Sequence, residues 1–452
     1  MTRDRSVHEI EVLEHGTSSE ARGPVTPCMI GRELRFDREA LARGCSTSLE
    51  KVDVDLLVVL ASLAFADRRT RRRRDGDWGR RLSLSIPVYQ PGTWSRLGSA
   101  LGSLLHDVSG DVWNLKFRKR TKPDELRQGF LPGLMPREFL GATVLPYSGG
   151  LDSFAALARH RLDHAGTPIL LVHAQHGARS LRSVLPARDQ TVPALAVPFK
   201  VAGGARAEPS YRTRTLIFFS LAALAWRRAG AARIWIGESG LGCMGPSLVP
   251  FGIEPPVRGC HPAFVAKLRD VFVQLWGVAP RFELPHLWST KGEALRELAD
   301  RGGLDRWDRT HSCSRNIRRQ HPETEATHCG VCSGCLFRRQ SLLAAGLVEP
   351  RGTYFVDVVR DAGLPTGAKR ADREIGTYAV VGLAELAALS TRGDYSAHVL
   401  EVAQARGLSE AETAPQFAHL LERHASEWHA LLGSLPQNSW VRQLAFPQHA
   451  NG

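Results

Sequence analysis

The sequence lacks any apolar run of the roughly 18 residues that a membrane-spanning helix needs. Its N-terminus, MTRDRSVHEIEVLEHG, lacks the apolar core of a secretion signal. Cysteine is scarce as well, because eight residues in 452 are too few for a secreted disulfide scaffold. We therefore expect a cytoplasmic protein that makes no contact with a membrane.

Acidic side chains are in the minority, since 46 Asp and Glu stand against 59 Lys and Arg and the formal net charge is +13. A basic balance favours an anionic partner such as nucleic acid, a nucleotide or an acidic protein, without choosing among them. Part of the excess lies in a run at Arg68, Arg69 and Arg71 to Arg74, which we expect on an exposed loop. Such a run is typical of a solvated loop, and it leaves a contact with nucleic acid or an acidic protein open.

The length suggests two or three domains. Residues 1–138 mix strand and helix patterns and carry no chemical motif, so we predict an N-terminal α+β domain. Residues 139–346 alternate short apolar runs with helical patterns, which predicts βαβ units around a parallel sheet, the α/β fold class. Residues 347–452 have the Leu and Ala spacing of packed helices and are predicted to form a C-terminal helical domain.

Hydrophobic periodicity predicts the individual elements. Strands are expected at 7–16, 80–89, 111–120, 142–147, 167–174, 231–237 and 279–286. Helices are expected at 54–69, 92–110, 152–164, 212–230, 290–302, 379–390 and 412–435.

A glycine-containing loop, SGGLDS at 148–153, joins the strand expected at 142–147 to the helix that follows. Two glycines let a ligand approach the backbone closely, and successive N–H groups at a helix N-terminus form an anion-binding site. Ser148 and Ser153 can donate hydroxyl hydrogen bonds. Asp152 suits a divalent cation that bridges it to a phosphate, or it caps the helix of a plain strand–turn–helix. The loop is neither a Walker A motif nor a dinucleotide-binding GxGxxG.

Four of the eight cysteines gather late in the chain: Cys313, Cys329, Cys332 and Cys335. Thiolates at these spacings suit a closed tetrahedral Zn²⁺ site, which is structural and not catalytic. An iron–sulfur cluster and redox-active cysteines are the alternatives. The nearby His311 and His328 are not needed as ligands, and we expect Arg338 and Arg339 to offset the thiolate charge.

The loop SGGLDS after the first strand of a parallel sheet resembles the PP-loop of ATP pyrophosphatase-type enzymes. In that superfamily the loop holds the phosphates of ATP, and the enzyme adenylates a carbonyl or carboxylate oxygen and releases pyrophosphate. Over about residues 142–346, the order of SGGLDS, RTLIFFSLA, STKGE and the cysteines resembles the QueC family of 7-cyano-7-deazaguanine (preQ0) synthases. Those enzymes adenylate 7-carboxy-7-deazaguanine, add ammonia to form an amide and dehydrate the amide to the nitrile.

The resemblance implies ATP, Mg²⁺ and Zn²⁺ as cofactors, and it implies a set of site residues. Lys291 lies in a Thr-Lys-x-Glu pattern, and Arg214 occupies the Arg position of an Arg-Asn-x-x-Phe pattern, in which Thr215 replaces the Asn. The implied catalytic residues are therefore Asp152, Lys291 and Arg214. The implied nucleotide-binding residues are Ser148, Gly149, Gly150, Leu151, Asp152 and Ser153. We add Ala174, because ligands of open parallel sheets bind at the carboxyl ends of strands. The implied zinc ligands are the four clustered cysteines.

Two departures from the family affect these expectations. The stretch IGESGLGCMGPSL replaces the usual acidic base-binding pattern, so Glu238 is either a substitute base-edge acceptor or support for the loop. The chain also carries flanking domains, an architecture that resembles the QueC-like proteins of bacterial anti-phage defence, especially the QatC component of Qat systems. Our hypothesis from the added domains is that the activated carboxylate of this chain's substrate passes to an amine of a partner protein instead of to ammonia.

The expected partners are therefore a deazaguanine, a partner protein and, through the Arg-rich run, nucleic acid. Two other functions stay open. One is a PP-loop enzyme that modifies tRNA, which the charge of +13 suits. The other is a non-catalytic ATP-binding subunit of a defence complex.

Overall fold

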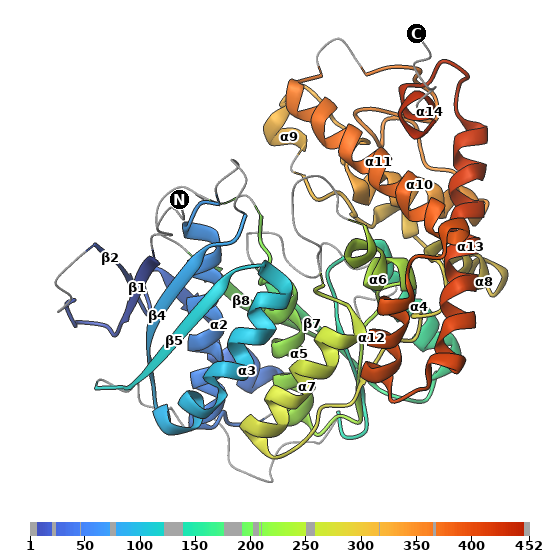
Figure 1. Ribbon diagram of the computed structural model, residues 1–452. Helices are drawn as coiled ribbons and strands as arrows, with labels where there is room; N and C mark the ends of the chain where they lie inside the picture. The colour runs from blue at the N-terminus through green and yellow to red at the C-terminus, as the bar shows by residue number, and fades with distance from the viewer. Residues whose placement is uncertain are drawn as a thin grey trace. The chain divides into compact units, whose positions relative to one another are not determined.

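A computed structural model describes residues 7–19, 24–45, 47–72, 78–121, 139–175, 192–201, 208, 210–249, 258–315, 317–364 and 368–446 (Figure 1). The chain packs into two compact units, each built from several segments. Unit 1 comprises Met1–Ser148, Gly166–Ile236 and Val257–Glu283, and unit 2 comprises Gly149–Ala165, Gly237–Pro256 and Leu284–Gly452. The predicted boundary at residue 138 lies outside the described residues, and the one at 346 coincides with no border of these units. The division into three domains stays a prediction.

Unit 1 contains a six-stranded sheet with the order β10-β9-β6-β7-β8-β3. Its strands are β3 (Leu34–Phe36), β6 (Thr143–Pro146), β7 (Ile169–Gln175), β8 (Ala194–Val201), β9 (Arg233–Trp235) and β10 (Phe282–Glu283). All neighbours in this sheet are parallel except β3, which pairs antiparallel with β8. The central strands are continuous apolar runs and their residues Val144, Leu145, Leu171 and Val172 are buried, as in most parallel sheets. The predicted α/β fold class with a parallel sheet is confirmed.

A second sheet in unit 1 has the order β2-β1-β4-β5, and the helix α3 (Pro91–Ser109) lies against β5 (Figure 1). Its strands are β1 (Val7–Leu13), β2 (Val25–Met29), β4 (Arg81–Val88) and β5 (Val112–Lys119). Every pair in it is parallel, whereas the predicted N-terminal part was of the α+β type. For β4 and β5, the reason is the connecting helix. After β4, α3 returns the chain to the end of the sheet at which β4 begins, so β5 runs in the same direction as β4. The N-terminal segment also contributes β3 to the six-stranded sheet.

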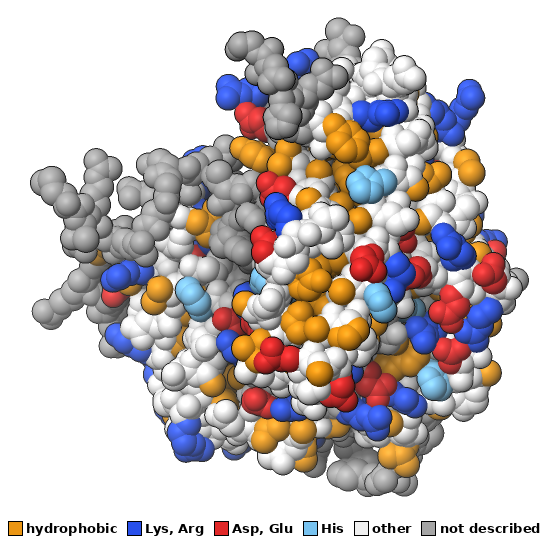
Figure 2. All heavy atoms as spheres, turned by 45° about the vertical axis from the view of Figure 1, so that its right-hand side comes forward, with side chains coloured by type: hydrophobic (Ala, Val, Ile, Leu, Met, Phe, Trp, Pro, Cys, Tyr) orange, Lys and Arg blue, Asp and Glu red, His pale blue; other side chains and the backbone are white. Residues whose placement is uncertain are grey.

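The remaining helices of unit 1 are α1 (Arg38–Gly44), α2 (Lys51–Arg69), α3 (Pro91–Ser109), α5 (Arg214–Ala229) and α7 (Pro262–Trp276). Helix α2 extends through Arg68 and Arg69, so these two residues do not lie on the exposed loop expected from the sequence. Arg72 is buried, and its guanidinium lies 2.7 Å from the carboxylate of the buried Asp111. Arg73 and Arg74 lie outside the described residues. On the face shown in Figure 2, basic side chains are interspersed with acidic ones.

Unit 2 is helical in its described residues apart from short connecting segments. Its helices are α4 (Leu151–Asp163), α6 (Gly240–Leu248), α8 (Lys291–Asp300), α9 (Ile317–Gln320), α10 (Ser333–Ala344), α11 (Arg370–Arg392), α12 (Ser396–Arg406), α13 (Glu410–Ser434) and α14 (Trp440–Ala445). One buried cluster joins Leu151 of α4 to Leu295 of α8 and Leu342 of α10. Another surrounds the cysteines and includes Trp428 of α13. The predicted C-terminal helical region is therefore confirmed. Within the described ranges, every helix is too short or too polar to cross a membrane.

Candidate nucleotide site and metal centre

The loop between β6 and α4 has a backbone suited to an anion. Gly149 has a φ of 77°, in the left-handed region that favours glycine. Gly150 is the N-cap of α4 and has no side chain that could accept from the first N–H groups of the helix. Ser148 is exposed, whereas Ser153 is buried and its Oγ donates to the carbonyl of Gly150 over 3.0 Å. A helix N-terminus that no side chain caps, next to a glycine turn, is an arrangement that binds phosphate.

Asp152 pairs with Lys291 instead of capping α4. Its Oδ2 lies 2.8 Å from Nζ of Lys291, and the two side chains are only 18% and 10% exposed. The N-cap position belongs to Gly150, so the capping role that the sequence left open for Asp152 is not realised. The ammonium also lies 5.4 Å from the centre of the Phe337 ring. The structure thus brings together two of the three predicted catalytic residues.

The start of α8 determines where Lys291 lies. Thr290 and Glu293 form a capping box: Thr290 Oγ1 accepts from the Glu293 N–H over 3.0 Å, and Glu293 Oε2 accepts from the Thr290 N–H over 2.8 Å. Burial opposes the charge of Lys291, but the carboxylates of Asp152 and Glu238 outweigh it and raise the pKa of Lys291. The lysine is therefore a cation at neutral pH, as a group that stabilises phosphate charge must be.

Glu238 completes this group of charges, because its side chain is hydrogen-bonded to Asp152. A Cβ on Gly242 would overlap the Glu238 carboxylate, and a Cβ on Gly237 would lie 2.7 Å from Cβ of Ala156 on α4. The two glycines therefore allow the turn to approach α4 with the carboxylate folded back. Burial and then the negative charge of Asp152 raise the pKa of Glu238 well above its ordinary range. The sequence suggests a base-edge or loop role for Glu238 and misses this pairing, although the flanking glycines are a signal of it.

Ala174 and Arg214 belong to unit 1, as does Ser148, whereas Asp152 and Lys291 belong to unit 2. Ala174 is buried near the carboxyl end of β7. Arg214 is the first residue of α5, is exposed, and holds its guanidinium 5.3 Å from the centre of the Phe218 ring. Their roles in nucleotide binding and catalysis stay predictions.

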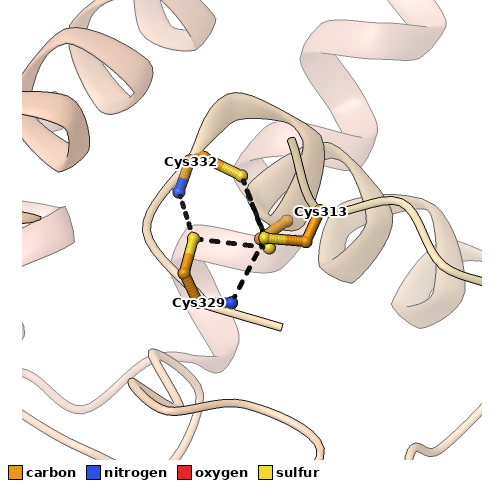
Figure 3. A group of neighbouring side chains, drawn as sticks. Cys313, Cys329 and Cys332 are labelled. Atoms are coloured by element: carbon orange, nitrogen blue, oxygen red, sulfur yellow. Dashed lines mark hydrogen bonds between the residues drawn. The ribbon is translucent and has the colours of Figure 1, made fainter. Parts of the chain in front are cut away.

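The four predicted metal ligands form one buried cluster, and the labelled cysteines in Figure 3 turn their sulfurs toward one another. The sulfur–sulfur distances are 4.0 Å for Cys313–Cys332, 3.8 Å for Cys329–Cys335 and 3.5 Å for Cys332–Cys335. These distances are too long for disulfides. A tetrahedron with metal–sulfur bonds of about 2.3 Å has edges of about 3.8 Å, so the group can hold a single ion such as zinc. A multi-iron cluster places its cysteines on different irons and would need wider separations.

The cationic neighbour of the cysteines is Arg315, which is hydrogen-bonded to Cys329. The expectation that Arg338 and Arg339 offset the thiolate charge is not met. Arg338 donates through Nε to Glu349 over 2.8 Å, and Arg339 donates through Nη1 to the same carboxylate over 3.4 Å. Glu349 is only 3% exposed, and a buried carboxylate needs such partners.

A short segment connects the cysteine cluster to the glycine loop. The backbone N–H of His311 donates to the carbonyl of Gly149 over 2.9 Å, two residues before Cys313. The intervening Ser312 donates its N–H to Nε2 of His328 over 3.2 Å. The metal ligands and the left-handed glycine of the loop are therefore linked through one stretch of backbone.

A metal-content measurement tests the cluster. We expect about one metal ion per chain, and we expect Cys332→Ser to lose most of it and to unfold at a lower temperature, because three thiolates leave a four-coordinate site incomplete. Cys260→Ser, outside the cluster, is the control and should keep the metal. Retention of the full metal content by Cys332→Ser, measured by elemental analysis, would contradict the assignment.

A pH titration tests Glu238. Its pKa is raised in the folded chain, so folding takes up a proton, and this stabilisation is complete below the ordinary carboxyl pKa of 4.5 and is lost as the pH rises through the raised value. Glu238→Gln should remove that loss, so the variant becomes more stable than the wild type toward pH 9 and the two converge toward pH 5. Thermal unfolding across this range is the measurement, and parallel curves would argue against the raised pKa.

One comparison with known proteins is informative. Over an aligned length of 167 residues, the chain is 32% identical to the 7-cyano-7-deazaguanine synthase of Nitrosococcus oceani. The aligned region covers 35% of this chain and 65% of that enzyme, so the chain covers less than two thirds of its relative. No family model matches the chain, and no solved structure matches it significantly. The similarity supports a distant relationship of this segment to the QueC family.

Proposed function

We propose that the chain is an ATP-dependent ligase of the QueC-like PP-loop type, which adenylates the carboxylate of a 7-deazaguanine and passes the acyl group to an amine. The observation that carries this proposal is the 2.8 Å contact between Asp152 and Lys291 beside the uncapped N-terminus of α4. A cation, a carboxylate and a helix N-terminus without a side-chain cap, all in one place, suit the phosphates of ATP. The similarity to a 7-cyano-7-deazaguanine synthase supports the substrate class.

The first step joins the substrate to AMP. A carboxylate oxygen of the deazaguanine attacks the α-phosphorus of ATP, the bond from that phosphorus to the β-phosphate oxygen breaks, and pyrophosphate leaves. The N–H groups at the start of α4 hold the phosphates, and Lys291 stabilises the negative charge that builds up on them in the transition state. Arg214 is proposed to assist as a second cation.

The second step releases AMP. The amine nitrogen attacks the acyl carbon of the adenylate, the bond from that carbon to the AMP oxygen breaks, and the nitrogen loses a proton. AMP leaves with one oxygen of the original carboxylate. With ammonia the product is the primary amide, which QueC-type enzymes dehydrate to the nitrile, and with a protein amine it is a stable amide link.

Two metals belong to this proposal. Asp152 would hold Mg²⁺, which offsets the charge of the ATP phosphates when bound. The four cysteines would hold Zn²⁺ in a closed structural site. Because the cluster is linked through His311 to Gly149, the cysteines also keep the glycine loop in place.

The acceptor that we propose is an amine of a partner protein, in a cytoplasmic anti-phage defence system of the Qat type. The similarity covers 35% of the chain, and the remaining segments provide room for a partner to dock. A tRNA substrate has weaker support, because Arg72 of the basic run is buried in an ion pair with Asp111.

Pyrophosphate release tests the proposed activity. The protein would be incubated with ATP, Mg²⁺ and 7-carboxy-7-deazaguanine, with and without ammonia. We expect release that depends on the deazaguanine and falls by at least about 100-fold in both Asp152→Ala and Lys291→Ala. The first variant removes the proposed ligand of Mg²⁺, and the second removes the cation that stabilises phosphate charge. Asp163→Ala, at the far end of α4, is the control. Release with RNA alone would favour tRNA modification, and ATP binding without release would favour a non-catalytic subunit.

A further inference from the structure

Helix α13, from the C-terminal part of the chain, contacts the start of α8 through two side chains one turn apart. Arg423 Nε lies 2.7 Å from Oε1 of Glu293, the acidic member of the capping box, and Arg423 also donates to the carbonyl of Trp288 over 2.8 Å. Glu427 accepts a short hydrogen bond from Oγ1 of Thr290, the N-cap of α8. Thr290 precedes Lys291 and Glu293 follows it, so α13 contacts both members of the capping box that flank the lysine.

The sequence of α8 leaves room for this contact. Its second residue is Gly292, and a Cβ there would overlap the Glu427 carboxylate and would lie 2.7 Å from Cβ of Ala344 on α10. A glycine in the first turn of a helix lowers its intrinsic stability relative to alanine. The close approach of α13 and α10 is the physical reason for its presence at this position.

Glu427 lies among buried polar side chains. The amide of Gln340, which is fully buried, donates to Glu427 Oε2 over 3.4 Å and lies 2.9 Å from Nδ1 of His424. Burial lowers the pKa of His424 to about 4, so the ring carries no charge at neutral pH. Burial also raises the pKa of Glu427 to about 7. A carboxyl group in such surroundings opposes folding unless its hydrogen bonds compensate, and the strongest of these is to Thr290.

We propose that Glu427 is a positioning residue for Lys291: by holding Thr290, it fixes the first turn of α8 so that the ammonium reaches Asp152. The inference rests on the proposed function, in which Lys291 stabilises phosphate charge. It makes the C-terminal helices part of the apparatus for adenylation, in addition to any role in binding a partner. A displacement of about 1 Å at a catalytic group can cost about 100-fold in rate, so a hydrogen bond outside the site can control the chemistry.

Kinetics of matched variants test this role. Glu427→Ala removes the acceptor for Thr290 and should lower kcat for pyrophosphate release by at least about tenfold while KM for ATP changes little. Glu427→Gln keeps an acceptor oxygen and should restore most of kcat. Gly292→Ala places a methyl group against the Glu427 carboxylate and should displace it from Thr290. This variant should therefore resemble Glu427→Ala. Glu422→Ala, an exposed position of the same helix, is the control and should behave as the wild type.

A purely structural role gives a different result. In that case Glu427→Ala would lower the unfolding temperature but keep the wild-type kcat when assayed well below that temperature, and this outcome would overturn the proposal. A second readout does not depend on turnover: the rate at which an amine-reactive acetylating reagent modifies Lys291, followed by mass spectrometry. We expect faster modification in Glu427→Ala than in Glu422→Ala. Equal modification rates would overturn the inference about Glu427, whether or not the wild type is active. Absence of activity in the wild type would refute the proposed function and leave this inference standing.

Discussion

The ion pair between Lys291 and Asp152 is the contact on which the rest of unit 2 depends. Two carboxyl groups and one ammonium are held together largely out of water, which is unfavourable unless each group has a partner within hydrogen-bonding distance. The fold supplies the partners from three separate segments: α4 carries Asp152, the turn after β9 carries Glu238, and α8 begins with Lys291. Glycines at 237, 242 and 292 allow these segments to approach closely enough.

Two sets of contacts help to position Asp152, Glu238 and Lys291. On one side, the segment that leads into the cysteine cluster donates a backbone hydrogen bond to Gly149. On the other side, α13 holds both ends of the capping box of α8 through Arg423 and Glu427. The cysteine cluster and the C-terminal helices therefore both contact the candidate nucleotide site. The segment before the cysteines is hydrogen-bonded to the glycine loop, and α13 is hydrogen-bonded to the start of α8. This explains how a short glycine loop can be kept in place within a unit that is largely helical.

Much of this arrangement could be predicted from local sequence. The strand at 142–147, the glycine loop and the helix after it are specified by apolar periodicity and by the need for glycine at positive φ, and the cysteines are identified by their spacing. The parallel N-terminal sheet was missed because strand periodicity does not report strand direction. The burial of Arg72 was missed because its partner Asp111 is distant in sequence. The roles of Glu238 and Glu427 depend on long-range contacts, of which the only local trace is a glycine beside each contact.

The central claim is that a carboxylate oxygen attacks the α-phosphorus of ATP beside Lys291 and Asp152. The most direct test uses 7-carboxy-7-deazaguanine labelled with ¹⁸O in its carboxylate, incubated with the protein, ATP, Mg²⁺ and ammonia, or the acceptor protein once it is known. The account predicts that the AMP released carries one ¹⁸O atom and that the pyrophosphate carries none. Turnover that leaves AMP unlabelled, or that produces ADP and labelled phosphate, would contradict it.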